Sequence, residues 1–173
     1  RIWAADEQGL TVEKWIDSGG QIFYDGRDIW IVCRNISGST INKGDWLLVN
    51  GAANGFPTVF LADADLINTN SQNSLANGAA MDTAANNGYL RLLLAGILSG
   101  VDTSGFSAGS SLFLSPTAGT AASTAPAIGA GWAQYLGRVL TSHATTGTIH
   151  VNPRPPYISQ TYSGTVSIGV GND

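Results

Sequence analysis

The chain has 173 residues, a length that fits one domain or one domain with appendages. Hydrophobic residues make up 43% of it, enough for a buried core, whereas charged residues make up only 12%, about half the usual share. The net charge is −4, and the eight basic residues are scattered, whereas a general nucleic-acid binder needs clustered basic side chains. We therefore expect no nucleic-acid partner and a β-rich protein with many loops.

Residues 1–26 show no settled periodicity, and ADEQGLTVEKWIDSGG is compatible with either a short helical turn or an extended arm. Aromatic side chains on an arm are typical anchors against a partner surface. Large aromatic side chains also close hydrophobic cores, which is the alternative for this segment. We predict an N-terminal arm over residues 1–26 in which Trp3, Trp15 and Ile16 contact a partner.

From residue 27 the pattern becomes that of short β-strands separated by turn residues. β-Branched and aromatic runs, bounded by Gly, Asn, Asp, Ser or Pro, recur at intervals of about 8–12 residues. The clearest runs occupy residues 27–35, 45–55, 56–64, 89–101, 110–116, 132–143 and 147–156. Roughly eight to ten such strands predict an all-β domain over residues 27–153, a compact barrel or sandwich of short strands with extended arms on both sides.

Two of these strands carry further signals. Cys33 is the only cysteine, which excludes an internal disulfide, and its setting in IWIVCRN predicts a buried, inert thiol. The run YLRLLLAGIL carries Arg91 and is shorter than the ~20 residues of a membrane-spanning helix, so we expect no membrane partner. The strand at 132–143 alternates between two sets of residues, Trp132, Gln134, Leu136, Arg138 and Leu140 against Ala133, Tyr135, Gly137, Val139 and Thr141.

Two stretches have the composition of loops. Residues 67–88 are small and polar, and we predict a long loop there with one short helical turn near SLANGAAM, residues 74–81. Residues 117–131 are of low complexity and are also predicted as a loop.

The last segment, residues 154–173, is predicted as a C-terminal extension. PRPP at 153–156 is predicted as a polyproline II segment that serves as a stiff spacer, with an SH3-type ligand as the alternative. The tail that follows alternates polar and apolar residues, as in a strand that is added to a sheet edge, its own or a neighbour's. The tail residues predicted to contact a partner are Tyr157, Ile158, Tyr162, Val166, Ile168 and Val170.

One phrase occurs twice. STINKGDWLL at 39–48 and SGFSAGSSLF at 104–113 share an apolar residue, two small or polar residues, a glycine and an apolar run. A glycine in such a phrase supplies backbone freedom for a bend before a strand. We predict that Gly44 and Gly109 are structural turns that open equivalent strands on opposite halves of a pseudo-symmetric scaffold.

Residues that could support catalysis or metal binding are few. His143 and His150 have no Cys or carboxylate near them at metal-ligand spacing. The carboxylates Asp63, Asp65, Asp82 and Asp102 lie in turn contexts, where Asp typically bonds the local backbone; the first two are a weak Ca²⁺ signal. We expect no catalytic residue, metal or cofactor; the remote alternative, a small hydrolase, requires one histidine to pair with Asp102.

Three quoted pieces resemble a β module of tailed-phage virion structural proteins. They are RNISGSTINKGDWLLVNGAANGFPTVFLADAD, GILSGVDTSGFSAGSSLFLSPTAG and LGRVLTSHATTGTIHVNP, in this order over about residues 30–153. The resemblance implies a non-enzymatic virion protein, either a capsid decoration (cement) subunit or a tail-fibre-type domain. The stretch at 73–88 is less apolar than the strand that such modules have there.

The short chain with two flanking extensions favours the capsid decoration protein. Such a protein is expected on the capsid exterior as a homotrimer that binds and bridges major capsid protein subunits, because closed symmetry must match the shell. The alternative is a tail-fibre or receptor-binding module on the tail that meets the host surface through the loops at 67–88 and 117–131.

Overall fold

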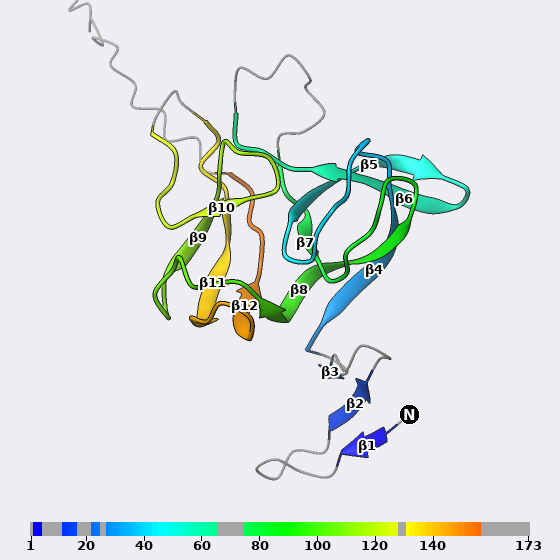
Figure 1. Ribbon diagram of the computed structural model, residues 1–173, viewed down its shortest axis with the longest axis horizontal. Helices are drawn as coiled ribbons and strands as arrows, with labels where there is room; N and C mark the ends of the chain where they lie inside the picture. The colour runs from blue at the N-terminus through cyan, green and yellow to red at the C-terminus, as the bar shows by residue number, and fades with distance from the viewer. Residues whose placement is uncertain are drawn as a thin grey trace, which may run out of the picture.

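The computed structural model describes residues 27–65, 75–127 and 131–156, together with the backbone of three short strands before them. The described residues contain strands and turns but no helix, so the chain is all-β as the sequence predicts (Figure 1). No helix long and apolar enough to cross a membrane occurs among these residues.

The strands form two sheets. Within residues 1–26, expected as an arm, β1 (Ile2–Ala4), β2 (Val12–Ile16) and β3 (Ile22–Tyr24) pair as a three-stranded antiparallel sheet. The larger sheet has nine strands in the order β10-β9-β11-β12-β8-β4-β6-β5-β7, with β7 also pairing with β8. Their bounds are β4 (Ile29–Asn35), β5 (Trp46–Ala53), β6 (Phe56–Leu61), β7 (Gly78–Ala80), β8 (Tyr89–Val101), β9 (Ser111–Leu114), β10 (Ala121–Ala122), β11 (Tyr135–Thr141) and β12 (Gly147–Val151).

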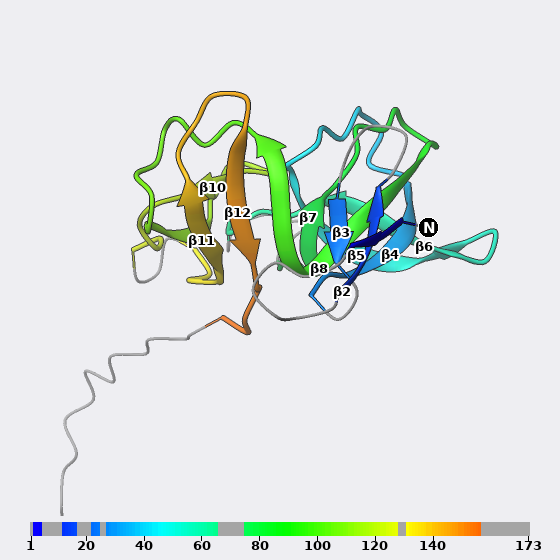
Figure 2. The same cartoon turned by 90° about the horizontal axis from the view of Figure 1, so that it is seen from below.

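The long strand β8 joins two lobes, with β4–β7 on one side of it and β9–β12 on the other (Figures 1 and 2). Residues 89–95 pair with β4, and the ladder then changes partner, since Ala95 lies opposite Ile29 whereas Gly96 lies opposite Val151 of β12. We call β4–β7 with residues 89–95 the first lobe, and residues 96–101 with β9–β12 the second lobe.

The two lobes repeat one pattern of antiparallel pairing. The pairs β5–β6, β5–β7 and β7–β8 of the first lobe correspond to β9–β10, β9–β11 and β11–β12 of the second. The pair of β4 with residues 89–95 likewise corresponds to the pair of residues 96–101 with β12. The fold is therefore an internal repeat in which one strand serves both copies.

Gly44 and Gly109 occupy equivalent turns of this repeat. Gly44 has φ +96° and lies two residues before β5, and Gly109 has φ +85° and lies two residues before β9. The Gly44 N–H donates to the carbonyl oxygen of Ala80 on β7 (2.9 Å), and the Gly109 N–H donates to that of Val139 on β11 (2.8 Å). Both glycines thus lie where the repeated phrase predicts, one in each lobe.

Closure of the barrel distinguishes the lobes. In the first lobe β6 runs parallel to β4, with Arg34 opposite Thr58 and Asn35 opposite Val59, so that β4, β6, β5, β7 and β8 form a closed barrel. In the second lobe the counterpart of β6 is the two-residue β10, which pairs with β9 alone in the described part of the chain. The second lobe is therefore an incomplete copy.

The cores follow this asymmetry. One cluster fills the first barrel and consists of Cys33, Ile41, Leu47, Val59, Ala80, Ala84, Leu90 and Leu92. The other spans both lobes and consists of Trp46, Ala62, Ala64, Ala76, Ala79, Met81, Leu93, Leu98, Val101, Leu112, Leu114, Leu136, Val139, Ile149 and Val151. On β5, Trp46 and Leu47 belong to different clusters, so the strand is buried on both faces there, as an unbroken apolar run such as WLLV at residues 46–49 indicates.

The expected helical turn at residues 74–81 is wrong, because this stretch forms β7. Its residues Gly78, Ala79 and Ala80 are all buried. Small side chains allow β7 to fit between β5 and β8, and an added Cβ at Gly78 would overlap the carbonyl oxygen of Leu93. Low apolarity at this position therefore marks a tightly packed strand.

Alanine at Gly78 or at its counterpart Gly137 should destabilise the fold by about 2 kcal/mol or more, because the new Cβ would overlap a carbonyl oxygen of the next strand (Leu93 or His150). Urea unfolding of each variant measures the loss. Gly105→Ala is the matched control, since nothing lies within 4 Å of its added Cβ. Equal stability of all three variants would contradict the strand spacing described above.

Cys33 is buried as the sequence predicts, and burial raises the pKa of its thiol to about 11 from an ordinary 9.0. At pH 8 the thiolate fraction is then about 100-fold lower than in the unfolded chain, so alkylation of the native thiol should be slower by at least that factor. Iodoacetamide labelling with and without urea measures the ratio, and equal rates would show that the thiol is accessible.

Candidate binding site

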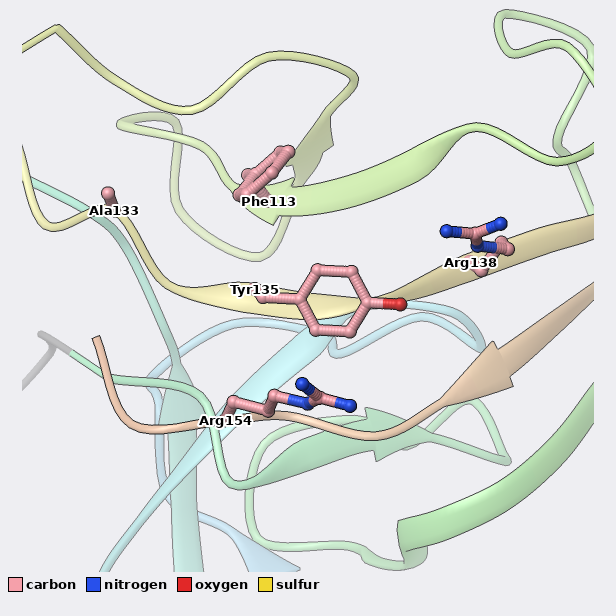
Figure 3. Close-up of a pocket in the computed structure, with 5 residues that line it drawn as sticks. All are labelled: Phe113, Ala133, Tyr135, Arg138 and Arg154. Carbon is pink, nitrogen blue, oxygen red and sulfur yellow. The ribbon is translucent and has the colours of Figure 1, made fainter. Parts of the chain in front are cut away.

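An open pocket of about 400 Å³ lies on the second lobe and is lined by two aromatic and two arginine side chains (Figure 3). We call it the arginine–aromatic pocket. Phe113 comes from β9, Tyr135 and Arg138 come from β11, Arg154 follows β12, and Ala133 completes the lining. The volume is in the range of small-ligand sites, about 300–1,000 Å³.

A β-bulge brings Tyr135 and Arg138 to the same face. Strict alternation along residues 132–143 would place them on opposite faces of β11. The register shifts between Tyr135 and Gly137, so that Tyr135 lies opposite Phe113 and Arg138 opposite Ser111, two residues apart on β9. In the sequence, Gly137 is the residue that could have indicated this bulge, because a glycine inside a strand often marks one.

The aromatic rings and Arg154 hold one another in place. The Phe113 and Tyr135 rings meet edge to face, with centroids 6.0 Å apart and planes at 78°. The Arg154 guanidinium carbon lies 5.4 Å from the Tyr135 ring centroid, a cation–π contact. The backbone N–H of Arg154 also donates a hydrogen bond to the backbone carbonyl oxygen of Tyr135 (2.9 Å). This bond fixes the chain after β12 against β11.

The pocket is cationic within an acidic protein. Arg138 and Arg154 are exposed, and the two half-buried aromatic rings lie beside them. No lining residue is a carboxylate, although the chain as a whole carries a net charge of −4. A planar guanidinium matches a carboxylate or phosphate group, and the rings offer an apolar surface next to it. The arrangement can bind an anionic group that has an apolar neighbour.

A smaller pocket of about 210 Å³ marks the seam where the second lobe is not closed. Its lining includes Val101 of β8, Ala121 of β10 and the Asp45 carboxyl group. Burial raises the pKa of Asp45, and the hydrogen bond that its carboxylate accepts from the Asn42 N–H (2.7 Å) opposes this rise. The seam lies beside the short β10, and its lining combines apolar side chains with Lys43, Asp45 and Asp102.

The first lobe carries an exposed apolar strip. Ile29, Trp30 and Val32 of β4 are 60%, 41% and 37% exposed. Nearby in the same lobe, Phe56 and Tyr89 form an edge-to-face pair with centroids 5.0 Å apart. None of these residues is among the partner contacts predicted from the sequence.

The partner contacts predicted from the sequence lie outside the residues whose side chains the structure describes. Trp3 falls on β1, and Trp15 and Ile16 fall on β2, for which only the backbone is described. The C-terminal contacts Tyr157, Ile158, Tyr162, Val166, Ile168 and Val170 lie outside the described residues.

The groups considered for catalysis are engaged in local turns. His143 and His150 are exposed, and the His143 Nδ1 accepts hydrogen bonds from the N–H groups of Thr145 and Thr146, both at 3.1 Å. The Asp102 carboxylate accepts from the Ser104 hydroxyl (2.7 Å) and N–H (2.9 Å). In the described part of the chain neither histidine ring bonds to Asp102.

The other candidate carboxylates also have structural contacts. Asp82 pairs with Arg91, with the Arg91 Nε 2.8 Å from an Asp82 oxygen, and Asp63 accepts from the Asp65 N–H at 3.2 Å. Among residues 27–65, 75–127 and 131–156, no three His, Cys, Asp or Glu side chains are grouped as metal ligands.

Comparisons with family models, with curated proteins and with solved structures give no match to this chain.

The Ser104 hydrogen bonds lower the pKa of Asp102, the hydroxyl contributing most. Ser104→Ala should raise this pKa towards its ordinary value, which ¹³C NMR titration of the carboxyl group measures. Because the folded pKa is depressed, the stability from this turn is present above the unfolded pKa of about 4 and is lost as the pH falls through the folded value. Ser37→Ala is the matched control, since its partner in the equivalent turn is Asn35, which does not titrate. An unchanged Asp102 titration in Ser104→Ala would contradict this assignment.

Proposed function

We propose that this chain is a non-enzymatic structural protein of a tailed-phage virion, a capsid decoration subunit that binds the outer shell and bridges major capsid protein subunits. One observation carries the proposal. The three pieces that resemble the phage module, residues 34–65, 96–119 and 136–153, coincide with strands that build the two lobes: β5 and β6, then residues 96–101 with β9, then β11 and β12.

The geometry of the lobes supports a binding role. The candidate catalytic carboxylates Asp82 and Asp102 and the His143 ring are engaged in local hydrogen bonds or an ion pair, whereas the exposed features are the apolar strip on β4 and the arginine–aromatic pocket. A continuous nine-stranded sheet holds these two surfaces on one scaffold. A decoration subunit needs this kind of scaffold, because modest contacts repeated over a shell add up through avidity.

The flanking segments supply further contacts in this proposal. In it, Trp3, Trp15, Ile16 and the tail at residues 157–173 engage neighbouring subunits. A homotrimer presents three copies of each segment to a threefold or quasi-threefold position of the shell. Light scattering of the purified chain measures the oligomeric state, and a monomer at all concentrations would contradict the trimer.

A tail-fibre or receptor-binding module is the second candidate, because an arginine–aromatic pocket would also suit an acidic sugar of a host surface. Immunogold labelling of virions separates the two. Gold on the head is expected, gold confined to the tail would establish the second candidate, and unlabelled virions would overturn the virion assignment altogether.

Deletion of residues 157–173 should reduce binding to empty capsids, because the proposal gives this tail a direct contact with the shell. Sedimentation with capsids measures the occupancy of the shortened chain against the full chain. Exchange of Leu140, an exposed residue of β11, for Ser leaves the tail intact and serves as the control. Undiminished occupancy after the deletion would overturn the role of the tail.

A further inference from the structure

The internal repeat relates one face of the second lobe to a face of the first lobe that packs against another β module. The outer face of β5, β7 and residues 89–95 carries Trp46, Ala79 and Leu93, which are all buried in the cluster that spans both lobes. Leu48 of β5 packs against the same cluster. In the first lobe, therefore, this face binds another β module, the second lobe.

The strand pairings locate the same face on the second lobe. Ala79 lies between Trp46 and Leu93 in the first lobe, and Arg138 lies between Ser111 and His150 in the second. Phe113, two residues beyond Ser111, takes the place that Leu48 has beside Trp46. This second copy of the face is open, since Arg138 and His150 are exposed and Phe113 is half-buried.

The chemistry of the open face differs from that of the covered one. The apolar residues Ala79 and Leu93 of the first lobe are replaced by Arg138 and His150, and Arg154 is added from the segment after β12. Burial of Arg138 and Arg154 under an apolar partner would leave two guanidinium groups buried without counter-charges, which is energetically unfavourable. The open face therefore excludes a repeat of the apolar lobe contact and fits an anionic partner.

We propose that the arginine–aromatic pocket is a protein-docking site that takes an acidic segment of another protein, with a carboxylate between Arg138 and Arg154 and an apolar neighbour on the rings of Phe113 and Tyr135. Charge complementarity supports this occupant, because two of the chain's eight basic residues line one pocket that contains no acid. The inference rests on the proposed structural role, and it names the chemistry of the partner at this site.

The preformed pocket has a physical advantage for this task. The Tyr135 ring contacts both the Phe113 ring and the Arg154 guanidinium (Figure 3), so less side-chain freedom is lost on binding. In the described residues the Arg138 side chain has no hydrogen bond or ion pair, so a carboxylate need not displace an internal partner. Binding should therefore weaken strongly as ionic strength rises.

NMR titration of the ¹⁵N-labelled chain at low ionic strength tests the proposal with acetylated, amidated hexaglutamate as the probe. The expected result is a set of saturable shifts in the backbone amides of β9, β11 and residues 152–154. Arg138→Gln with Arg154→Gln should reduce the affinity at least about tenfold, because two charge-assisted contacts are lost. Both side chains are exposed, and circular dichroism checks that the double variant remains folded.

Controls separate this site from general attraction between charges. Arg34→Gln removes an arginine of β4 that donates to the Asn87 side chain at 3.0 Å, and this variant should bind hexaglutamate like the parent. Hexaglutamine should cause no shifts. Equal affinity of the parent and the double variant would overturn the proposal. Shifts of the same amides by N-acetylneuraminic acid, with none by hexaglutamate, would also overturn it in favour of an acidic glycan.

The two proposals fail in different experiments. Capsid sedimentation of the double variant beside the parent tests the docking site within its proposed setting, and reduced occupancy is the expected result. If the double variant binds capsids as strongly as the parent does, the docking site is overturned and the decoration role still stands. Hexaglutamate binding that depends on Arg138 and Arg154, in a chain that labels no virion, would support the site and overturn the virion role.

Discussion

The hydrogen-bond ladder of β8 is the constraint on which the rest of the structure depends. Along its thirteen residues the strand first completes a barrel with β4 and β7 and then pairs with β12 of the second lobe. The change occurs at Gly96, which has φ +133° and lies so close to Asp28 that a Cβ there would overlap its carboxylate. The Asp28 carboxylate accepts from the Ile97 N–H at 2.8 Å, so it ties the start of β4 to the point of exchange.

The two lobes share β8 but differ in how completely each one is closed. The first lobe closes its own barrel, whereas the second lobe, with its two-residue β10, takes part of its enclosure from the first. Backbone hydrogen bonds join the segments directly: the Trp46 N–H donates to Gly119 (2.9 Å) and the Gly119 N–H donates to Ala62 (2.7 Å). The Trp46 side chain fills the space between the lobes. The two lobes therefore form one structural unit, which suits a protein that must transmit load or hold contacts at fixed spacing.

The pocket arises from the same asymmetry. A face that one copy of the repeat uses for internal packing is left open in the other, and the open copy carries arginine and histidine in place of alanine and leucine. A bulge at Leu136 and Gly137 then sets Tyr135 beside Arg138. The same face of the repeat is thus an internal contact in the first lobe and a candidate external contact in the second, where the surface residues, the β11 bulge and the short β10 all differ.

Much of this fold follows from local sequence patterns. The strand runs, the turn glycines Gly44 and Gly109, the buried Cys33 and the repeated phrase all predict an all-β repeat, because β-branched runs and glycine turns act over a few residues. β7 was missed because its small residues have no apolar signal of their own, and their suitability depends on how closely β5 and β8 approach. The pairing of Tyr135 with Arg138, and of both with Arg154, likewise had no sequence signal beyond Gly137. Such contacts depend on strand register and on chain segments far apart in sequence, and these are set when the whole sheet assembles.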